Sequence, residues 1–187
     1  QLNATVLGIF PEKRITVRFA DHVEQFAGDN IIVATGAAEN MVLFDGWTNP
    51  GVIGAGAAQT LMNLHGVQPG QNILMVGSGN VGLVVSYQLL QAGCKVAALI
   101  DAAPTILRAE GKDQVEGAVI AEVDDKFQPI PGTEKHLDVD TICLAVGLSP
   151  MSQVLRMSGC EIDDTPGGLV PKTDAYGETT IPGLFAA

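Results

Sequence analysis

The feature that most constrains this chain is a short apolar run that leads through three glycines into a helical pattern. Residues 72–76 are mostly apolar and too few for a helix, which is typical of a buried strand. The glycines stand at positions 77, 79 and 82, and a second apolar run, 95–100, closes on Asp101. This order predicts a strand–turn–helix–strand unit of an α/β protein, with Gly93 as a left-handed cap on the helix. The apolar positions at helical spacing are Val81, Val84, Val85, Leu89 and Ala92.

The three glycines have separate physical roles in such a turn. Gly77 permits the sharp bend, Gly79 lets backbone N–H groups approach a diphosphate, and Gly82 allows the helix to pack closely on the strand. The free N–H groups and the dipole of the helix N-terminus favour negative charge. We therefore expect the pyrophosphate of a dinucleotide to bind Gly77, Ser78, Gly79, Asn80, Val81 and Gly82.

Asp101 is the residue that discriminates between dinucleotides. A carboxylate at the end of the second strand accepts hydrogen bonds from the adenosine ribose hydroxyls and repels a 2′-phosphate, which favours NAD over NADP. The first arginine after it is Arg108, too late to bind a phosphate there. The alternative is that the glycines form a turn without a ligand and that Asp101 is a solvated strand end.

The remaining patterns predict further elements of a chain with two related parts. Residues 4–20 read as a hairpin around Pro11, residues 30–36 as a buried parallel strand, and residues 57–64 as a short helix. Strands are expected at 114–123 and 137–146. Residues 29–37 and residues 140–148 carry Asp, Ile, Ala and Gly at the same offsets. We therefore expect two similar domains, each of which ends in a strand with this pattern.

Composition excludes several classes of partner. The chain has 187 residues, 47% of them hydrophobic, which is enough for a core, and a formal net charge of -11. Phosphate backbones and anionic lipids are bound by basic surfaces, so neither nucleic acid nor membrane is an expected partner. No apolar run approaches the length of a membrane span, and the first residues lack the layout of a signal peptide, so a cytoplasmic location is expected.

No metal site or nucleophile is visible in the sequence. Cys94, Cys143 and Cys160 form no C-x-x-C pair, so they are interpreted as small core residues. The histidines are interpreted as isolated from carboxylates and without a catalytic role, and residues 161–164 as a solvated edge or turn. The histidines are His22, His65 and His136.

Taken together, the motifs resemble the pyridine nucleotide-disulfide oxidoreductase superfamily of flavoproteins that bind two dinucleotides. Residues 34–36 match its Ala-Thr-Gly turn, residues 77–82 its NAD(P) fingerprint, residues 140–147 the closing strand of its nucleotide domain, and residues 179–187 the run before its flavin motif. Residues 50–59 are similar to sarcosine, opine and cyanide-forming oxidoreductase subunits. The resemblance implies NAD and FAD as cofactors, with further binding residues at Ala34, Thr35, Gly36, Ala145, Val146 and Gly147.

The implied fold is α/β, a Rossmann-like NAD-binding domain inserted between fragments of an FAD-binding domain. Residues 1–50 and 151–187 would be the FAD fragments, and residues 51–150 the NAD domain. The flavin domain's own glycine fingerprint does not occur, and the chain stops before the Gly-Asp flavin motif, so this chain alone should not hold FAD tightly. Only residues 102–113 lie between Asp101 and the next meander, where a doubly wound nucleotide domain has another helix and strand. A parallel crossover needs about a dozen residues by itself, before the strand that it leads to is counted. We therefore expect residues to be missing between Ala102 and Ile106.

The expected function is hydride exchange between NAD(H) and FAD in an oxidoreductase with a second, unidentified substrate or electron-transfer partner. A homodimer is one assembly that the sequence allows. The alternatives are a non-catalytic NAD-binding module and a subunit that completes a partner's active site. A dehydrogenase without flavin is disfavoured because the Ala-Thr-Gly strand precedes the fingerprint. The Tyr-x-x-x-Lys pattern of one such class does not occur either: the fourth residue after Tyr87 is Gln91, and the fourth after Tyr176 is Thr180. No catalytic residue is evident.

Overall fold

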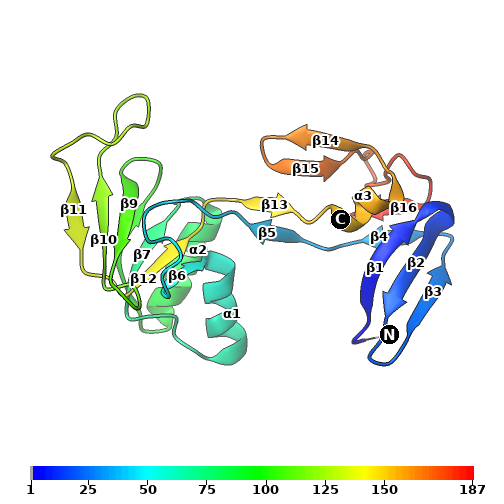
Figure 1. Cartoon of the computed structure of the whole chain (residues 1–187), viewed down its shortest axis with the longest axis horizontal. Helices are drawn as coiled ribbons and strands as arrows, with labels where there is room; N and C mark the ends of the chain where they lie inside the picture. Colours follow the sequence, from blue (N-terminus) through cyan, green and yellow to red (C-terminus); the bar gives the residue numbers. More distant parts are fainter. Residues whose placement is uncertain (1) are drawn as a thin grey trace. The chain divides into compact units, whose positions relative to one another are not determined.

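The computed structural model describes residues 2–187, which form two compact units (Figure 1). Unit 1 combines the chain up to Ala38 with Leu148–Ala187, and unit 2 is Glu39–Gly147. The middle of the chain is therefore inserted between two segments that fold together. The units divide at residues 38–39 and 147–148, whereas the sequence predicted 50–51 and 150–151, because Glu39 and Phe44 already contact unit 2.

The centre of unit 2 is a four-stranded parallel sheet in the order β6-β12-β7-β8. Side chains alternate between its two faces along each strand. Ile73 and Met75 point to helices α1 and α2, whereas Leu74 and Val76 point to the opposite face. The bounds are β6 Val52–Gly54, α1 Ala55–His65, β7 Asn72–Val76, α2 Asn80–Gln91, β8 Lys95–Ile100 and β12 Thr141–Leu144.

An antiparallel meander covers the other face of the sheet and completes a three-layer unit. It consists of β9 (Thr105–Glu110), β10 (Gly117–Ala121) and β11 (Lys135–Leu137). Its buried residues, among them Ile106 and Ala118, pack with Leu74 in one core. The sequence pattern missed β9, whose residues look like part of a connection. The single strand expected at 137–146 is wrong, because the chain turns at Asp140 and separates β11 from β12. The carboxylate of Asp140 accepts hydrogen bonds from the backbone N–H groups of residues 71 and 72.

The helix and strands around the glycines agree with the sequence, apart from the register of α2. Gly93 has φ +86° and follows the helix as expected. The buried positions of α2 are Gly82, Val85, Ser86 and Leu89, whereas Val81 and Val84 are exposed. The strand β8 continues into β9 through residues 101–104 without a helix between them. That residues are missing at this point stays a prediction.

Unit 1 has a separate small core of Ile9, Val33, Leu155, Cys160 and Leu184. The predicted hairpin is present, and the strand at 30–36 shortens to β4, which pairs in parallel with β16. Its burial was overestimated: Ile32 is 72% exposed, because its side chain lies on the opposite face of β4 from Val33, which belongs to the core. The bounds are β1 Thr5–Phe10, η1 Pro11–Lys13, β2 Arg14–Arg18, β3 Val23–Ala27, β4 Ile31–Val33, α3 Gln153–Ser158, β14 Ile162–Thr165, β15 Gly168–Pro171 and β16 Leu184–Ala186.

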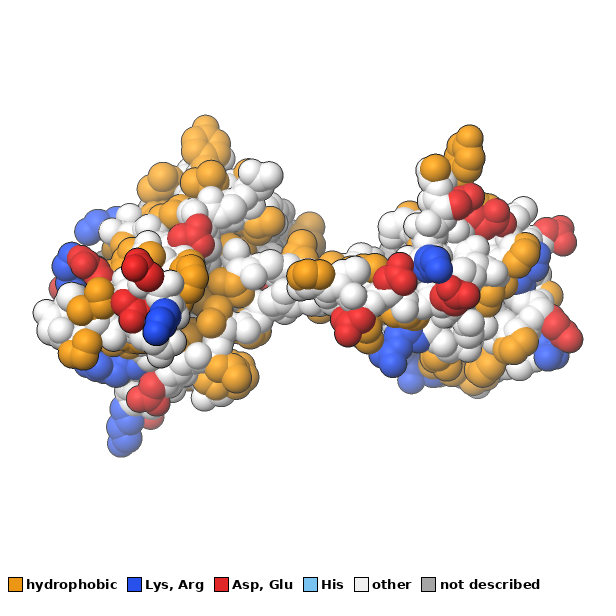
Figure 2. Space-filling view, turned by 90° about the horizontal axis from the view of Figure 1, so that it is seen from above, with side chains coloured by type: hydrophobic (Ala, Val, Ile, Leu, Met, Phe, Trp, Pro, Cys, Tyr) orange, Lys and Arg blue, Asp and Glu red, His pale blue; other side chains and the backbone are white. Residues whose placement is uncertain are grey.

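Two short strands, β5 (Ala37–Glu39) and β13 (Leu148–Pro150), connect the units and pair with each other. In the described part of the chain, no helix combines the length and the apolar character needed to span a bilayer. The face shown in Figure 2 carries Lys and Arg side chains interspersed with Asp and Glu on both units.

Candidate functional site

The turn between β7 and α2 requires glycine at its two ends. Gly77 has φ +108°, and its N–H donates to the carbonyl of Ile100 at 2.7 Å. A Cβ at Gly77 would lie 2.3 Å from the carbonyl oxygen of Ala145, and one at Gly82 would lie 1.9 Å from the carbonyl oxygen of Gly77. Both contacts are with backbone, which cannot move aside. Glycine at these positions therefore lets α2 start directly against the sheet.

Gly79 differs from Gly77 and Gly82 because the position that its Cβ would take is open. It is the N-cap of α2 in extended conformation, and a Cβ built there would meet no atom within 4 Å. No side-chain hydrogen bond caps this helix, and its first turn, which begins with Asn80, Val81 and Gly82, contains no acidic residue. The first N–H groups of a helix have no partner within the helix. The N-terminus of α2 thus presents free donors to an open space.

The first helix of the same unit is satisfied internally. The carboxylate of Glu39 accepts hydrogen bonds from the backbone N–H of Gly56 at 2.6 Å and of Ala57 at 3.3 Å, at the start of α1. Both helices follow parallel strands of one sheet, so both N-termini lie at its carboxyl edge. Among residues 2–187, a carboxylate caps α1 and no side chain caps α2. This contrast marks α2 as the helix able to receive an external anion.

A cleft of about 360 Å³ lies at this edge. The ends of three neighbouring strands and the glycine turn form its walls, which is where ligands bind in open α/β sheets. Gly147 lies one residue beyond, with φ +116°, and its carbonyl accepts a hydrogen bond from the N–H of Asn40 at 3.0 Å. The predicted residues that line the cleft are Gly77, Ser78, Gly79, Asp101, Ala145 and Val146.

Asp101 is exposed, and both of its carboxylate oxygens accept hydrogen bonds. The Ser78 hydroxyl donates to Oδ2, and the Ala102 N–H donates to Oδ1 at 2.9 Å. These hydrogen bonds, first the one from Ser78, lower the pKa of the Asp101 carboxyl below its usual value. The side chain is therefore ionised at neutral pH and acts as a hydrogen-bond acceptor only.

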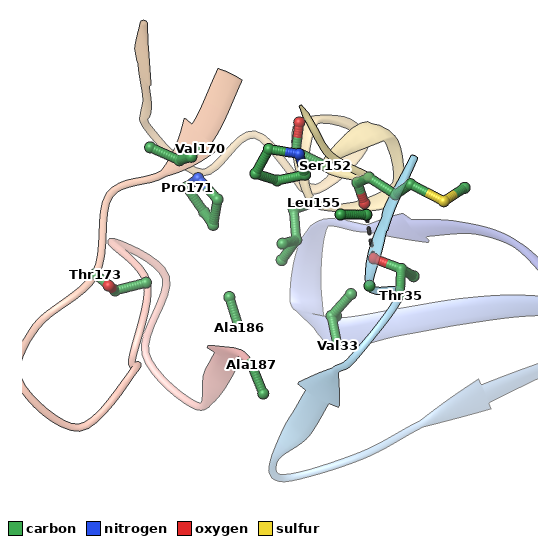
Figure 3. Close-up of a pocket in the computed structure, with 13 residues that line it drawn as sticks. Val33, Thr35, Ser152, Leu155, Val170, Pro171, Thr173, Ala186 and Ala187 are labelled. Carbon is green, nitrogen blue, oxygen red and sulfur yellow. Dashed lines mark hydrogen bonds between the residues drawn. The ribbon is translucent and has the colours of Figure 1, made fainter. Parts of the chain in front are cut away.

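The other predicted site residues lie in unit 1, so the predicted set forms two sites. Ala34, Thr35 and Gly36 follow β4, and the Thr35 hydroxyl donates to the carbonyl of Met151 at 2.7 Å (Figure 3). Thr35 and Gly36 line a second cavity of about 380 Å³, with Leu155 at its wall. The carbonyl of Gly36 accepts from the N–H of Met151, as that of Gly147 does from Asn40, so the internal sequence echo has a structural counterpart.

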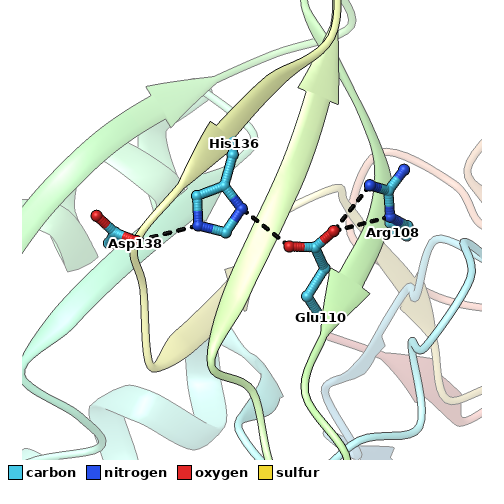
Figure 4. A network of polar contacts seen from close by, with 4 residues as sticks. All are labelled: Arg108, Glu110, His136 and Asp138. Carbon is cyan, nitrogen blue, oxygen red and sulfur yellow. Dashed lines mark hydrogen bonds and ion pairs between the residues drawn. The ribbon is translucent and has the colours of Figure 1, made fainter.

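The interpretation of the histidines as isolated is wrong for His136. Its Nδ1 lies 2.9 Å from Oε2 of Glu110, and its Nε2 lies 3.0 Å from Oδ1 of Asp138 (Figure 4). Arg108 contacts the same Glu110 through two nitrogens, at 3.0 and 2.7 Å. His22 also has a carboxylate partner, Asp21, at 2.7 Å. The His136–Glu110 contact crosses the meander and was invisible in sequence, whereas Asp138 stands only two residues after His136, just beyond the end of β11.

The cysteines are core residues, as predicted. Cys94, Cys143 and Cys160 are buried, and none forms a disulfide within residues 2–187. Burial, and then the nearby charge of Glu39, raises the pKa of Cys143 to about 12. A thiol with that pKa stays protonated at neutral pH and is a poor nucleophile.

Two relatives bear out the resemblance to subunits of opine oxidase and sarcosine oxidase. An opine oxidase subunit from Agrobacterium tumefaciens is 25% identical over 84% of this chain and 38% of its own length. The alpha subunit of sarcosine oxidase from Rhizobium meliloti is 28% identical over 64% of this chain and 13% of its own length. The chain therefore spans much less than half of these relatives.

Solved structures share the fold. L-proline dehydrogenase from P. horikoshii superposes with a TM-score of 0.76 at 23% identity, covering 98% of this chain and 35% of that protein. Water-forming NADH oxidase from Lactobacillus brevis, bound to NADH, gives 0.69 at 21% identity, covering all of this chain and 45% of that one. The predicted α/β fold of FAD- and NAD(P)-binding oxidoreductases is thus confirmed. The family model for pyridine nucleotide-disulphide oxidoreductases matches residues 1–187, so the chain belongs to that family.

Proposed function

We propose that unit 2 binds NAD(H) at residues 77–82 and that the whole protein is an FAD-dependent oxidoreductase in which NAD(H) and flavin exchange a hydride. The observation that carries the proposal is the open N-terminus of α2 at Gly79, where an added Cβ would meet no atom of the described residues beyond its chain neighbours within 4 Å. Because α1 is already capped by Glu39, the diphosphate would be drawn to α2 alone. The structure of an NADH oxidase with NADH bound shares this fold, which supports the choice of ligand.

Asp101 supports NAD rather than NADP. Its ionised carboxylate lies in the same cleft as the glycine turn, where it would accept hydrogen bonds from the adenosine ribose. A 2′-phosphate would meet a like charge there. The walls of the cleft are otherwise apolar at Ala145 and Val146, so they would orient the dinucleotide without adding charge.

The flavin would supply the redox chemistry, and the residues of this chain would bind and orient it. In unit 1, Thr35 and Gly36 line the cavity that follows β4, at a position where the family resemblance places a flavin-domain turn. No Cys, His or Lys of the described residues lines either cavity, and we assign no residue a catalytic role. NAD(H), FAD in the full-length protein and a second substrate are the proposed partners. The cytoplasmic location and the homodimer stay predictions.

The decisive experiment mixes the full-length protein with NADH or NADPH in a stopped-flow instrument and follows flavin absorbance. NADH should bleach the flavin rapidly. Asp101→Asn should bring the rates of bleaching by NADH and by NADPH closer together. His65→Gln, on α1 and away from the cleft residues, is the matched control. Bleaching by NADPH alone would overturn the role proposed for Asp101, and no bleaching by either would overturn the hydride exchange.

A second candidate is a nucleotide-binding subunit that completes the active site of a partner chain. The observation that favours it is that both curated relatives are named as subunits of oxidases. Flavin absorbance in the purified full-length protein separates the two functions. A colourless protein that still binds NADH would support the subunit or a non-catalytic NAD-binding module, whereas bound flavin reduced by NADH would support the oxidoreductase.

A further inference from the structure

An exposed aspartate at a strand end is ordinarily free to change rotamer, but Asp101 is held from two sides. One carboxylate oxygen accepts from the N–H of Ala102, the next residue along the chain. The other accepts from the hydroxyl of Ser78, which belongs to the glycine turn after the neighbouring strand β7. Among residues 2–187, Ser78 is the side chain that donates to this carboxylate. The hydrogen bond between Ser78 and Asp101 therefore connects the part of the cleft that would hold the diphosphate with the part that would hold the ribose.

The turn gives Ser78 a defined position. It stands between Gly77, which is buried with positive φ, and Gly79, the N-cap of α2. Both Ser78 and Asp101 line the cleft, so their contact lies where the ligand would lie. Alanine at position 78 would keep the turn and the backbone N–H of residue 78, and it would remove the hydroxyl donor.

We infer that Ser78 is a positioning residue that sets the selectivity for NAD(H) over NADP(H) by fixing the Asp101 carboxylate. The inference rests on the proposed nucleotide site. Selectivity is a difference between two affinities, and a fixed carboxylate acts on both of them. It is already oriented to accept a hydrogen bond from the 2′-hydroxyl, and it cannot swing into water to escape a 2′-phosphate. A loose carboxylate binds the hydroxyl less well and repels the phosphate less.

The test measures the dissociation constants of NADH and NADPH for the full-length protein and its variants by fluorescence titration. Ser78→Ala should lower the ratio of the NADPH constant to the NADH constant by roughly three- to tenfold, the range expected for loss of one hydrogen bond to a charged group that water partly replaces. Ser78→Gly removes the same hydroxyl and should give the same ratio. Ser78→Thr keeps a hydroxyl and should restore the ratio to within about twofold of the unmodified chain.

Two further variants separate positioning from general damage. In an Asp101→Asn background, Ser78→Ala should leave the ratio unchanged, because the charge that it positions is gone. Thr60→Ala removes an exposed hydroxyl on α1 that donates to the carbonyl of Gly56 in the same helix, and it should alter neither constant. If the chain binds NADH and Ser78→Ala keeps the full ratio, the inference is wrong and the proposed function stands. If the chain binds neither nucleotide, both are overturned.

Discussion

Gly79 and Gly82 belong to one motif but differ in what a methyl group would meet. At Gly82 it would lie 1.9 Å from a backbone oxygen, whereas at Gly79 it would point into open space. A change from glycine to alanine also stiffens the unfolded chain, which favours the folded state where the conformation is compatible. Gly79 is extended, so alanine fits there. The two positions therefore test packing and ligand access separately.

We predict that Gly82→Ala lowers the free energy of unfolding by about 1–3 kcal/mol or more, because the start of α2 must move from the sheet. Gly79→Ala should leave that free energy unchanged or raise it by up to about 1 kcal/mol, yet weaken NADH binding by occupying the approach to the turn. Urea unfolding and NADH titration of both variants check this. A Gly79→Ala variant that binds NADH normally would argue against diphosphate binding at this turn.

At the scale of an element, α2 offers a direct test of its register. Leu89 is fully buried and Leu90 is 55% exposed, although they are adjacent and chemically identical. Leu89→Ala should lower the free energy of unfolding by about 2–5 kcal/mol, the usual cost of a cavity in a core. Leu90→Ala should change it by less than about 0.5 kcal/mol. Thermal or urea unfolding measures both, and equal losses would mean that the exposed face of α2 is covered in solution.

The meander carries a network whose contribution to stability depends on pH. Asp138, and then Glu110, raises the pKa of His136, and Arg108, and then His136, lowers the pKa of Glu110. The raised pKa of His136 adds stability that is complete below the ordinary histidine value of 6.5 and is lost as pH rises through the folded value. The lowered pKa of Glu110 adds stability that is complete above 4.5 and is lost as pH falls.

We therefore predict that His136→Gln reduces stability most between pH 4.5 and 6.5, where both contributions are present. The difference from the unmodified protein should shrink above and below that window. Urea midpoints measured from about pH 4 to about pH 9 check the profile. His65→Gln serves as the control, since His65 has no ion pair in the described part of the chain. A pH-independent difference would show that His136 contributes by packing alone.

Sequence patterns predicted some elements well and others badly, for physical reasons. The strands β7 and β8 and the helix α2 were predictable because apolar runs and glycine punctuation are local signals. Strand β9 was missed because Arg108 and Glu110 interrupt its apolar residues, and only the pairing with β10 makes it a strand. The buried face of α2 was predicted incorrectly because it includes Gly82 and Ser86, which are not strongly hydrophobic. Small residues are buried here because the helix packs closely against its neighbours.

At the scale of the whole molecule, the two units have cores that share no residue. The core of unit 1 includes Ile9 and Leu184, and the cores of unit 2 centre on Leu74 and Met75. Unit 1 is discontinuous in sequence, because the first and last segments of the chain pair through β4 and β16. Each unit can therefore respond to a ligand of its own.

We predict that calorimetry resolves two unfolding transitions and that NADH raises the temperature of one. A ligand at about 100 times its dissociation constant stabilises the part that it binds by about 2.7 kcal/mol. Leu74→Ala, in the core of unit 2, should lower the transition that NADH raises, and Leu184→Ala should lower the other. A single transition shifted by both variants would contradict independent units.

The sequence by itself determined the glycine turn, its flanking strand and helix, and the acidic residue after the next strand, because each depends on local backbone conformation or periodicity. The repeated Asp-Ile-Ala-Gly run also indicated two similar domains, and the family resemblance implied that one is inserted into the other. Only the tertiary structure decided that Glu39 caps α1, that Ser78 contacts Asp101, and that Glu110 pairs with His136. These contacts join residues distant in sequence, and no local pattern encodes which distant side chains meet when strands align.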